Sequence, residues 1–290
     1  MIWVSSRWKI LLMVAPALIV FTGFVIYPVV YSLGFSFTKF QGFGAPEWIG
    51  FDNYAALAVD PFFWQALQNT IVILVVSLAI LIPASFGLAL LLRRRIAGGG
   101  TLRALVFGPA IIAPILVGLI WVFILDPKIG LLNRVLGFFG AAPVQWIGGD
   151  TLTPYAVSLV FIWSSIGFAM TIFYAGLQLL PSDVMEASAI DGATGWQQLR
   201  HITVPMMRET FAIVTILMIT NVFKIFELVF MLTGGGPVHR SETLVSYMYF
   251  VTFTNQQYGY GMALAVIITV LGAVVSAGYL VVSRGRKQPA

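Results

Sequence analysis

The chain has 290 residues, of which 59% are hydrophobic and 9% are charged, and its mean hydropathy is +0.95. Soluble domains carry about 25% charged residues, so this composition excludes a protein that faces water on all sides. The absence of cysteine excludes disulfides, thiol catalysis and zinc–thiolate sites. The placement of the basic residues explains the formal charge of +5 better than nucleic-acid binding does.

Six apolar runs are long enough to cross a bilayer, which takes about 20 helical residues. They cover residues 10–37, 66–92, 104–125, 154–180, 206–232 and 260–282. Pro, Gly, Ser or Thr occurs in every run, but neighbouring helices can satisfy a loosened backbone, so these residues need not split the runs. The first run is too long for a cleavable signal peptide and predicts an uncleaved anchor. The sequence predicts an all-α polytopic membrane protein with a single transmembrane domain, residues 1–290.

The basic residues predict the orientation of the chain, because cytoplasmic segments carry an excess of Lys and Arg. One side of the predicted membrane receives Arg7, Lys9, Arg93, Arg94, Arg95, Arg103, Arg200, Arg208, Arg284, Arg286 and Lys287. The other side receives Lys39, Lys128, Arg134 and Arg240. We therefore expect both termini, and the polar stretch 181–205, in the cytoplasm of a cell whose inner membrane holds the protein.

The stretch 181–205 predicts two short helices between the fourth and fifth runs. Asp183 with Glu186 three residues later is a capping-box pattern, which predicts the start of the first helix. The dipeptide Asp191-Gly192 predicts its end, because glycine readily adopts the left-handed conformation of a helix terminus.

A second capping box predicts the second short helix, with Thr194 as the cap and Gln197 three residues later. This helix is expected to run from Gly195 to about Thr203. On local physics alone, the hairpin is either a docking surface for another protein or an ordinary polar loop.

The hairpin resembles the EAA signature of permease subunits of binding-protein-dependent ABC importers. That signature is Glu-Ala-Ala, then Asp-Gly-Ala, then Ile-x-Leu-Pro at fixed spacing, and the chain departs from it at Ser188 and Val204. Segments such as "GFDNYAAL" and "MLTGGGPVHRSETL" are similar to those of carbohydrate-uptake permeases. The resemblance implies that the ATPase-coupling residues are Glu186, Ala187, Ser188, Asp191, Gly192, Ala193, Gly195, Ile202 and Pro205.

The resemblance also implies partners. Residues 183–204 would transmit the closure of two ATP-binding subunits, with Glu186 facing a basic residue and Gly192 fitting the turn beneath it. A second related permease and an external solute-binding protein would complete the importer. No G-x-x-x-x-G-K-[ST] occurs in the chain, so ATP and Mg would be bound by another subunit and the chain itself would hold no cofactor.

Polar side chains within the apolar runs are candidates for a solute pathway, because charges at membrane depth normally face a cavity or a partner. In the fifth run, Asn221, Lys224 and Glu227 are three residues apart and would share nearly one helical face. Lys224 and Glu227 can then form an ion pair. That pair either fixes helix packing or forms a wall of the pathway.

The fourth run offers a second group, Trp163, Ser164, Ser165 and Phe168. A sugar presents C–H faces that pack on aromatic rings and hydroxyls that need hydrogen-bonding partners. Trp163 either stacks on the solute or packs between helices.

We expect a permease that moves a di- or oligosaccharide into the cytoplasm by alternating access. Glycerol 3-phosphate is an alternative solute, since Lys224 would face its anion. An ion-coupled secondary transporter that uses Lys224 and Glu227 is a second hypothesis, but no internal repeat supports it. His201 and His239 are far apart, and neither H-E-x-x-H nor a Ser/His/Asp arrangement occurs, so no metal or catalytic site is predicted and the chain is not expected to be an enzyme.

Overall fold

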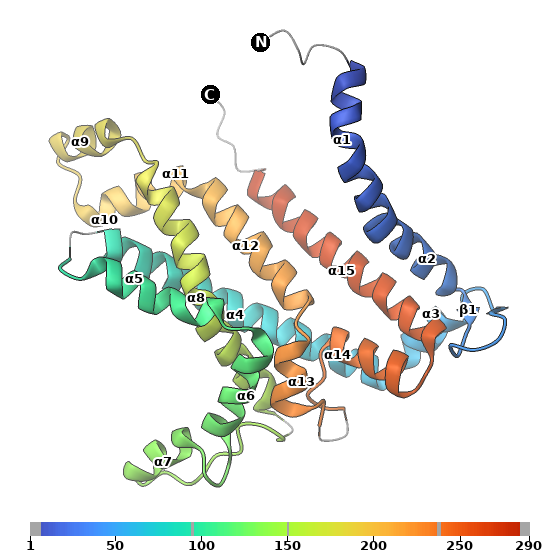
Figure 1. Ribbon diagram of the computed structural model, residues 1–290. Helices are drawn as coiled ribbons and strands as arrows, with labels where there is room; N and C mark the ends of the chain where they lie inside the picture. Colours follow the sequence, from blue (N-terminus) through green and yellow to red (C-terminus); the bar gives the residue numbers. More distant parts are fainter. Residues whose placement is uncertain (1–6, 94–95, 150, 237–238, 285–290) are drawn as a thin grey trace. The chain divides into compact units, whose positions relative to one another are not determined.

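The computed structural model describes residues 7–93, 96–149, 151–236 and 239–284. It is almost entirely helical, which confirms the predicted all-α membrane fold (Figure 1). The chain forms two compact units, Met1–Asp60 with Met248–Thr269 and Pro61–Tyr247 with Val270–Ala290. The single domain inferred from the sequence stays a prediction. Among the basic residues used to predict orientation, Arg94, Arg95, Arg286 and Lys287 lie outside the described residues.

Four helical segments are long and apolar enough to cross a membrane: Leu11–Phe35, Pro61–Arg93, Thr153–Gln178 and Tyr258–Ser283. Two bent helix pairs bring the number of candidate spans to as many as six within the described residues. The run predicted at 104–125 lies in the first of these pairs, and the second pair bends by 66° at Met207, where the run predicted at 206–232 begins. That run breaks again at residues 224–226, so neither run is the continuous span that we predicted.

The third run bends by 98° between the pair Gly99–Ile111 and Pro114–Leu125. Helix α5 (Gly99–Phe107) continues as the 3₁₀ turn η2 (Gly108–Ile111), and α6 (Pro114–Leu125) begins after two residues that are not helical. Pro114 lies at the start of α6, where its missing N–H costs no hydrogen bond. Proline thus ends one helix and allows the next to start in a new direction.

The smaller unit begins with α1 (Arg7–Phe21), the π-helical turn η1 (Thr22–Ile26) and α2 (Tyr27–Phe35). Pro28 has no N–H to donate, and its ring would clash with the carbonyl four residues earlier, inside η1, which accounts for the widened turn. A short antiparallel pair, β1 (Thr38–Lys39) and β2 (Glu47–Trp48), is followed by α3 (Asp52–Val59).

Hydrogen bonds from side chains hold these short elements together. The Asn53 amide donates to the carbonyls of Ser36 at 2.8 Å and Thr38 at 3.0 Å. The Tyr260 hydroxyl donates to the Asp60 carboxylate at 2.5 Å, and Tyr260 lies near the start of α15 (Tyr258–Arg284). The π turn η4 (Phe250–Thr254) also belongs to this unit, whereas most of α14 (Leu244–Tyr249) belongs to the larger unit, which includes the chain up to Tyr247.

The larger unit is built on two long helices, α4 (Pro61–Arg93) and α8 (Thr153–Gln178), which pack along each other and against α12 (Arg208–Phe223). One aromatic ring from each helix meets in the core: Phe86, Phe173 and Phe211 lie with ring centroids 4.7–5.4 Å apart. Such rings bury large apolar areas and interlock the three helices. The unit also contains α7 (Leu131–Phe138) and α13 (Glu227–Thr233).

Glycine allows two helices of this unit to touch backbone to backbone. A Cβ on Gly167 of α8 would lie 2.1 Å from the carbonyl oxygen of Val106 in α5. Small residues that permit such close approach are typical of helix contacts in membranes. The crossing holds α5 and the bend at residue 112 against α8.

Candidate functional site

The polar hairpin follows α8 and contains α9 (Ser182–Ile190), α10 (Gly195–Gln198), the π turn η3 (Leu199–Thr203) and α11 (Val204–Met206) (Figure 1). Helix α9 begins at Ser182 with Pro181 at the cap position and has no side-chain cap. The capping box predicted for Asp183 and Glu186 is therefore wrong. A proline at the cap position fixes the backbone direction in which the chain enters the helix. Asp183 lies in the first turn, where its negative charge interacts favourably with the positive end of the helix dipole.

The second predicted capping box is confirmed. The Thr194 hydroxyl accepts from the N–H of Gln197 at 3.4 Å, and the Gln197 side chain accepts from the N–H of Thr194 at 2.7 Å. The predicted turn is confirmed as well: α9 ends at Ile190, and Gly192 adopts a φ of +79°. An L side chain at this position would be strained.

Ser188, one of the two departures from the EAA pattern, connects the two short helices. It is buried, and its hydroxyl donates to the Met185 carbonyl at 2.7 Å. The Gln198 amide in α10 donates to the Ser188 hydroxyl at 3.0 Å and to the Met185 carbonyl at 3.4 Å. The hairpin is thus a rigid unit and not a slack loop.

The outer face of α9 is exposed. Glu186, Ala187 and Ile190 are open to solvent, and Ile190 is 86% exposed. Trp196 in α10 is 68% exposed. An apolar and acidic face on a rigid, polar hairpin is suited to contact another protein.

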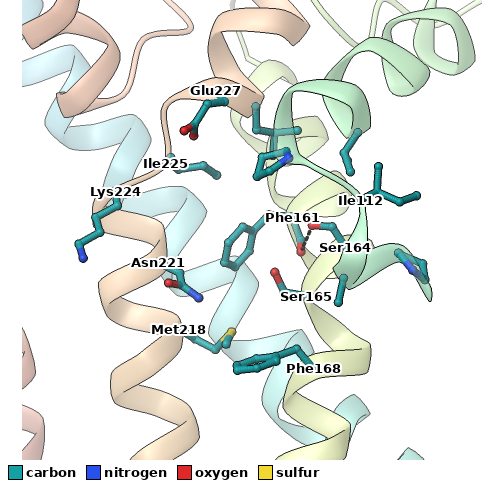
Figure 2. A pocket seen from close by; sticks show the side chains of 15 residues that line it. Ile112, Phe161, Ser164, Ser165, Phe168, Met218, Asn221, Lys224, Ile225 and Glu227 are labelled. Atoms are coloured by element: carbon teal, nitrogen blue, oxygen red, sulfur yellow. Dashed lines mark hydrogen bonds between the residues drawn. The ribbon is translucent and has the colours of Figure 1, made fainter. Parts of the chain in front are cut away.

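A cavity of about 450 Å³ lies within the larger unit, between α6, α8, α12, α13 and the bend after α5 (Figure 2). Its volume is within the range of about 300–1,000 Å³ that is usual for small-molecule sites. The lining residues are Pro109, Ala110, Ile112, Pro114, Val117, Phe161, Ser164, Ser165, Phe168, Met218, Asn221, Lys224, Ile225, Glu227 and Leu228.

Six of the seven residues predicted for the solute pathway line this cavity: Ser164, Ser165, Phe168, Asn221, Lys224 and Glu227. Asn221 of α12 and Ser165 of α8 extend toward the space between the two helices (Figure 2). The seventh, Trp163, is not among the lining residues. Its ring packs edge-on against Trp121 of α6, with centroids 5.5 Å apart.

The fifth run breaks at the cavity wall. Lys224 caps the end of α12, Ile225 and Phe226 are not helical, and Glu227 is the first residue of α13. The expected helical face shared by Lys224 and Glu227 does not exist, and the two side chains form no ion pair within 4.0 Å. Within the described residues, no hydrogen-bond partner meets the Asn221 amide, the Lys224 ammonium or the Glu227 carboxylate. These three groups are therefore available to a solute or to water.

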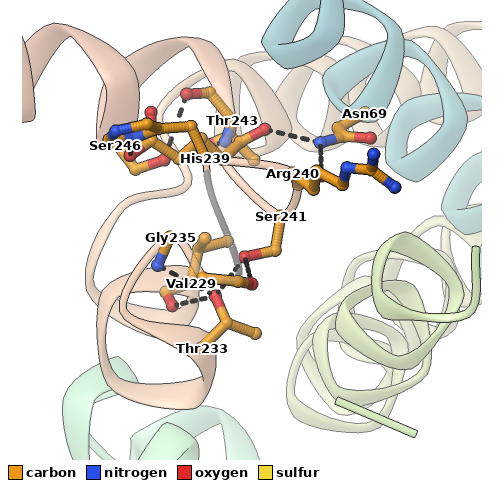
Figure 3. Close-up of polar contacts among 11 residues, drawn as sticks. Asn69, Val229, Thr233, Gly235, His239, Arg240, Ser241, Thr243 and Ser246 are labelled. Atoms are coloured by element: carbon orange, nitrogen blue, oxygen red, sulfur yellow. Dashed lines mark hydrogen bonds and ion pairs between the residues drawn. The ribbon is translucent and has the colours of Figure 1, made fainter. Parts of the chain in front are cut away.

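A buried cluster of polar side chains supports the break from outside the run (Figure 3). The Thr243 hydroxyl donates to the carbonyl of Ile225 at 3.0 Å, and the Ser246 hydroxyl accepts from the N–H of Thr243 at 2.8 Å. A carbonyl freed by a helix break inside a membrane costs several kcal/mol unless it finds a partner, on the order of a lost hydrogen bond in hydrocarbon. Sequence reasoning missed Thr243, because it lies 18 residues from the carbonyl that it satisfies.

Helix α4 fixes the same cluster. The Asn69 amide donates to the carbonyls of Arg240 at 2.7 Å and Glu242 at 2.8 Å (Figure 3). The N–H of Leu244 donates to the Thr70 hydroxyl at 3.1 Å. The segment 240–246 is thus held to α4 on one side and to the break on the other.

One buried carboxylate belongs to this cluster. Glu242 is 3% exposed, and its Oε1 lies 2.9 Å from Nδ1 of His239. Burial raises the pKa of Glu242, and the hydrogen bond with His239 opposes that rise. Its Oε2 has no hydrogen-bond partner among the residues that the structure describes.

The described part of the chain contains no group of three or more His, Cys, Asp or Glu residues that would hold a metal ion.

Comparison with known proteins places the chain among transport components. The sequence profile of the family described as "Binding-protein-dependent transport system inner membrane component" matches residues 82–288. A trehalose/maltose transport system permease protein of Thermococcus litoralis is 30% identical over 278 residues, which cover 95% of this chain and 94% of the relative. A sulfoquinovosyl glycerol transport system permease protein of Agrobacterium fabrum is 31% identical over 283 residues, which cover 97% and 92%.

A solved structure shares the fold. It is the crystal structure of a bacterial ABC transporter involved in the import of the acidic polysaccharide alginate, and it matches with a TM-score of 0.83. The match covers 97% of this chain and 96% of the other at 23% identity. At that identity the likeness is evidence for the fold alone.

Proposed function

Because the chain belongs to the family of inner membrane components of binding-protein-dependent transport systems, we propose that it forms part of the solute pathway of an ATP-driven sugar importer. As a permease component of an ABC importer, the chain is not an enzyme. The observation that carries the proposal is the cavity of about 450 Å³, whose lining includes Asn221, Lys224 and Glu227, three polar side chains that no described protein group satisfies.

The chemistry of the cavity suits a sugar. Ser165 and Asn221 offer hydrogen-bonding groups, and Phe161 and Phe168 offer aromatic faces on which C–H surfaces can pack. Lys224 and Glu227 bring one charge of each sign to the same wall, so the cavity carries no excess positive charge for a phosphate. This balance favours a di- or oligosaccharide over glycerol 3-phosphate. The relative whose name specifies trehalose and maltose, two neutral disaccharides, supports the same choice.

The rigid hairpin would couple this pathway to ATP hydrolysis. Two partner subunits would bind ATP and Mg, and their closure would push on residues 183–204. Because the hairpin is continuous with α8 and α12, which both line the cavity, its displacement would reshape the cavity. The exposed Glu186 would meet a basic residue of the ATPase, and the left-handed turn at Gly192 would let the hairpin seat beneath it.

The assembly would contain a second related permease and a solute-binding protein on the outer side. One chain contributes up to six spans, which are few for a complete pathway, so a pair of permeases is favoured. Both termini and the hairpin would face the cytoplasm, as the basic residues predict. ATP binding would open the cavity outward while the binding protein docks, and hydrolysis would reset it.

The test is uptake by the assembled importer in proteoliposomes. Labelled maltose, trehalose and glycerol 3-phosphate are compared with ATP inside the vesicles, without ATP, and with an ion gradient alone. We expect ATP-dependent uptake of a sugar. Uptake driven by an ion gradient without ATP would replace the proposal with a secondary transporter.

A variant links the uptake to the cavity. Asn221→Ala removes one hydrogen-bonding group, which is worth about 0.5–1.5 kcal/mol, so the half-saturating sugar concentration is expected to rise by roughly 2–10-fold. Thr220→Ala is the control, because the Thr220 hydroxyl bonds to Ile216 in its own helix and does not line the cavity. Equal uptake kinetics for the two variants would remove Asn221 from the pathway.

A further inference from the structure

The segment between α6 and α8 carries an amphipathic helix whose apolar side is uncovered. Leu131, Val135 and Phe138 of α7 are spaced at i, i+4 and i+7 and therefore share one face. They are 60%, 43% and 89% exposed, and Ile129 and Phe139 extend the exposed apolar surface at either end.

This helix is held firmly by one buried side chain. The Asn133 amide donates to the carbonyls of Pro127 at 3.0 Å and Val144 at 2.9 Å. Its Oδ1 accepts from the N–H of Val144 at 3.1 Å and from the indole N–H of Trp146 at 2.9 Å. With four hydrogen bonds, Asn133 closes the loop 127–146 on itself. The exposed apolar face is therefore presented in a fixed orientation and is not a loose tail.

The segment begins where a membrane span ends. Helix α6 ends at Leu125, and the Asp126 carboxylate accepts from the N–H groups of Lys128 and Ile129, each at 2.8 Å. These two hydrogen bonds lower the pKa of Asp126, because they stabilise the ionised carboxylate that accepts them. After the turn, α7 runs in a different direction from α6 but remains in contact with it (Figure 1).

The charged side chains of α7 and the turn before it are mainly basic. Lys128 and Arg134 are exposed, α7 contains no Asp or Glu, and the Asp126 carboxylate is engaged by the N–H groups of Lys128 and Ile129. A protein surface that docks a partner would need acidic groups on that partner, whereas lipid phosphates lie next to the end of every membrane span. Short amphipathic helices with Lys or Arg beside an apolar face bind at the boundary between headgroups and acyl chains.

We propose that α7 is a lipid-binding surface that lies in the membrane interface. Leu131, Val135 and Phe138 enter the acyl boundary, and Lys128 and Arg134 contact lipid phosphates. The bilayer thereby fixes the depth, relative to the lipid headgroups, of the outer loop between α6 and α8. Both of these helices line the cavity.

The absence of cysteine from the chain makes the test direct. Phe138→Cys and Gln145→Cys are made separately in the assembled importer and placed in vesicles of phosphatidylcholine and phosphatidylglycerol. Both positions are exposed and belong to the same loop, so they face the same side of the membrane. The rate of alkylation by a charged maleimide is measured for each, without the solute-binding protein.

We expect Phe138→Cys to react at least about tenfold more slowly than Gln145→Cys, because a charged reagent does not enter the acyl boundary. A fluorophore on Phe138→Cys is also expected to be quenched by lipids that carry a nitroxide near the headgroup. Equal alkylation rates would overturn the proposal, since the face would be in water. Slow alkylation without lipid quenching would also overturn it, since another subunit would then cover the face.

Discussion

The hairpin and the broken cavity wall are both polar interruptions of an apolar chain, yet they are stabilised in opposite ways. The hairpin bonds are local: Thr194 with Gln197, and Ser188 with Gln198 ten residues later. The wall depends on distant residues, since Thr243 bonds to Ile225 and Asn69 of α4 bonds to Arg240, 171 residues away. The first region would keep its shape when it is pushed as a unit, whereas the second depends on the packing of several helices.

Reversing a charge on the hairpin surface should cause the largest loss of transport, and it should do so without the loss of thermal stability expected at the cavity wall. Glu186→Lys leaves the hairpin bonds intact, because Glu186 is exposed. Truncating or opposing a charge pair at an interface costs about 2–5 kcal/mol, so ATPase co-purification and uptake should fall by at least about tenfold with no change in thermal stability. Glu47→Lys, an exposed charge on β2, is the control. Normal co-purification with normal uptake would contradict the coupling role of the hairpin.

At the cavity wall, a substitution is expected to cause a smaller loss of transport, accompanied by a loss of thermal stability. Thr243→Val keeps the shape of the side chain and removes the donor to the buried Ile225 carbonyl. An unsatisfied buried group costs about 1–3 kcal/mol, so thermal stability and sugar uptake should fall together. Thr269→Val is the matched control, because the Thr269 hydroxyl bonds only to Ala265 of its own helix at an exposed position. If both variants unfold at the same temperature and transport equally, the cluster does not support the wall.

The next largest loss of transport is expected from a substitution at Gly192, in the turn of the hairpin. Nothing lies within 4 Å of a Cβ built on Gly192, so Gly192→Val meets no clash and only the positive φ opposes it. That strain costs about 1–2 kcal/mol. Uptake and ATPase co-purification should drop severalfold, while Gly278→Val in α15, where no atom lies within 4 Å of a built Cβ and φ is not positive, should be tolerated. Equal results for the two variants would show that the left-handed turn is not needed.

The smallest effect is expected at Ser188. Ser188→Ala restores the residue of the EAA pattern and removes two hydrogen bonds, but the Gln198 amide still reaches the Met185 carbonyl. With about 0.5–1.5 kcal/mol per bond, the sugar transported per ATP hydrolysed should fall modestly, by less than roughly threefold. Ser182→Ala, an exposed position at the start of α9, serves as the control. A larger loss for Ser182→Ala than for Ser188→Ala would contradict a connecting role for Ser188.

The sequence predicted the local features better than the long-range ones, and the reason is physical. The second capping box, the Gly192 turn and the membrane class follow from neighbouring residues or from composition. The break at Ile225 carries no Pro or Gly, and its stabilising donor at Thr243 is not adjacent in sequence. The first capping box failed because Pro181 occupies the cap position that Asp183 was expected to hold.

The cavity residues show the same limit. Ser164, Ser165 and Asn221 were predicted from polarity within an apolar run, and they line the cavity. Trp163 was grouped with them by adjacency, but in a helix neighbouring residues point in different directions. It packs on Trp121 instead. Its part in the solute pathway, like that of the lining residues, stays a prediction.

The backbone contact between Gly167 and Val106 limits which motions are open to the permease. No side chain lies between α8 and α5 at this point, so neither helix can slide along the other without breaking the contact. We therefore expect the bend at residue 112 and the wall at Ser164 and Ser165 to move together. Because α6 also packs closely on α13 at Gly118, a change in the width of the cavity would come mainly from a movement of α12.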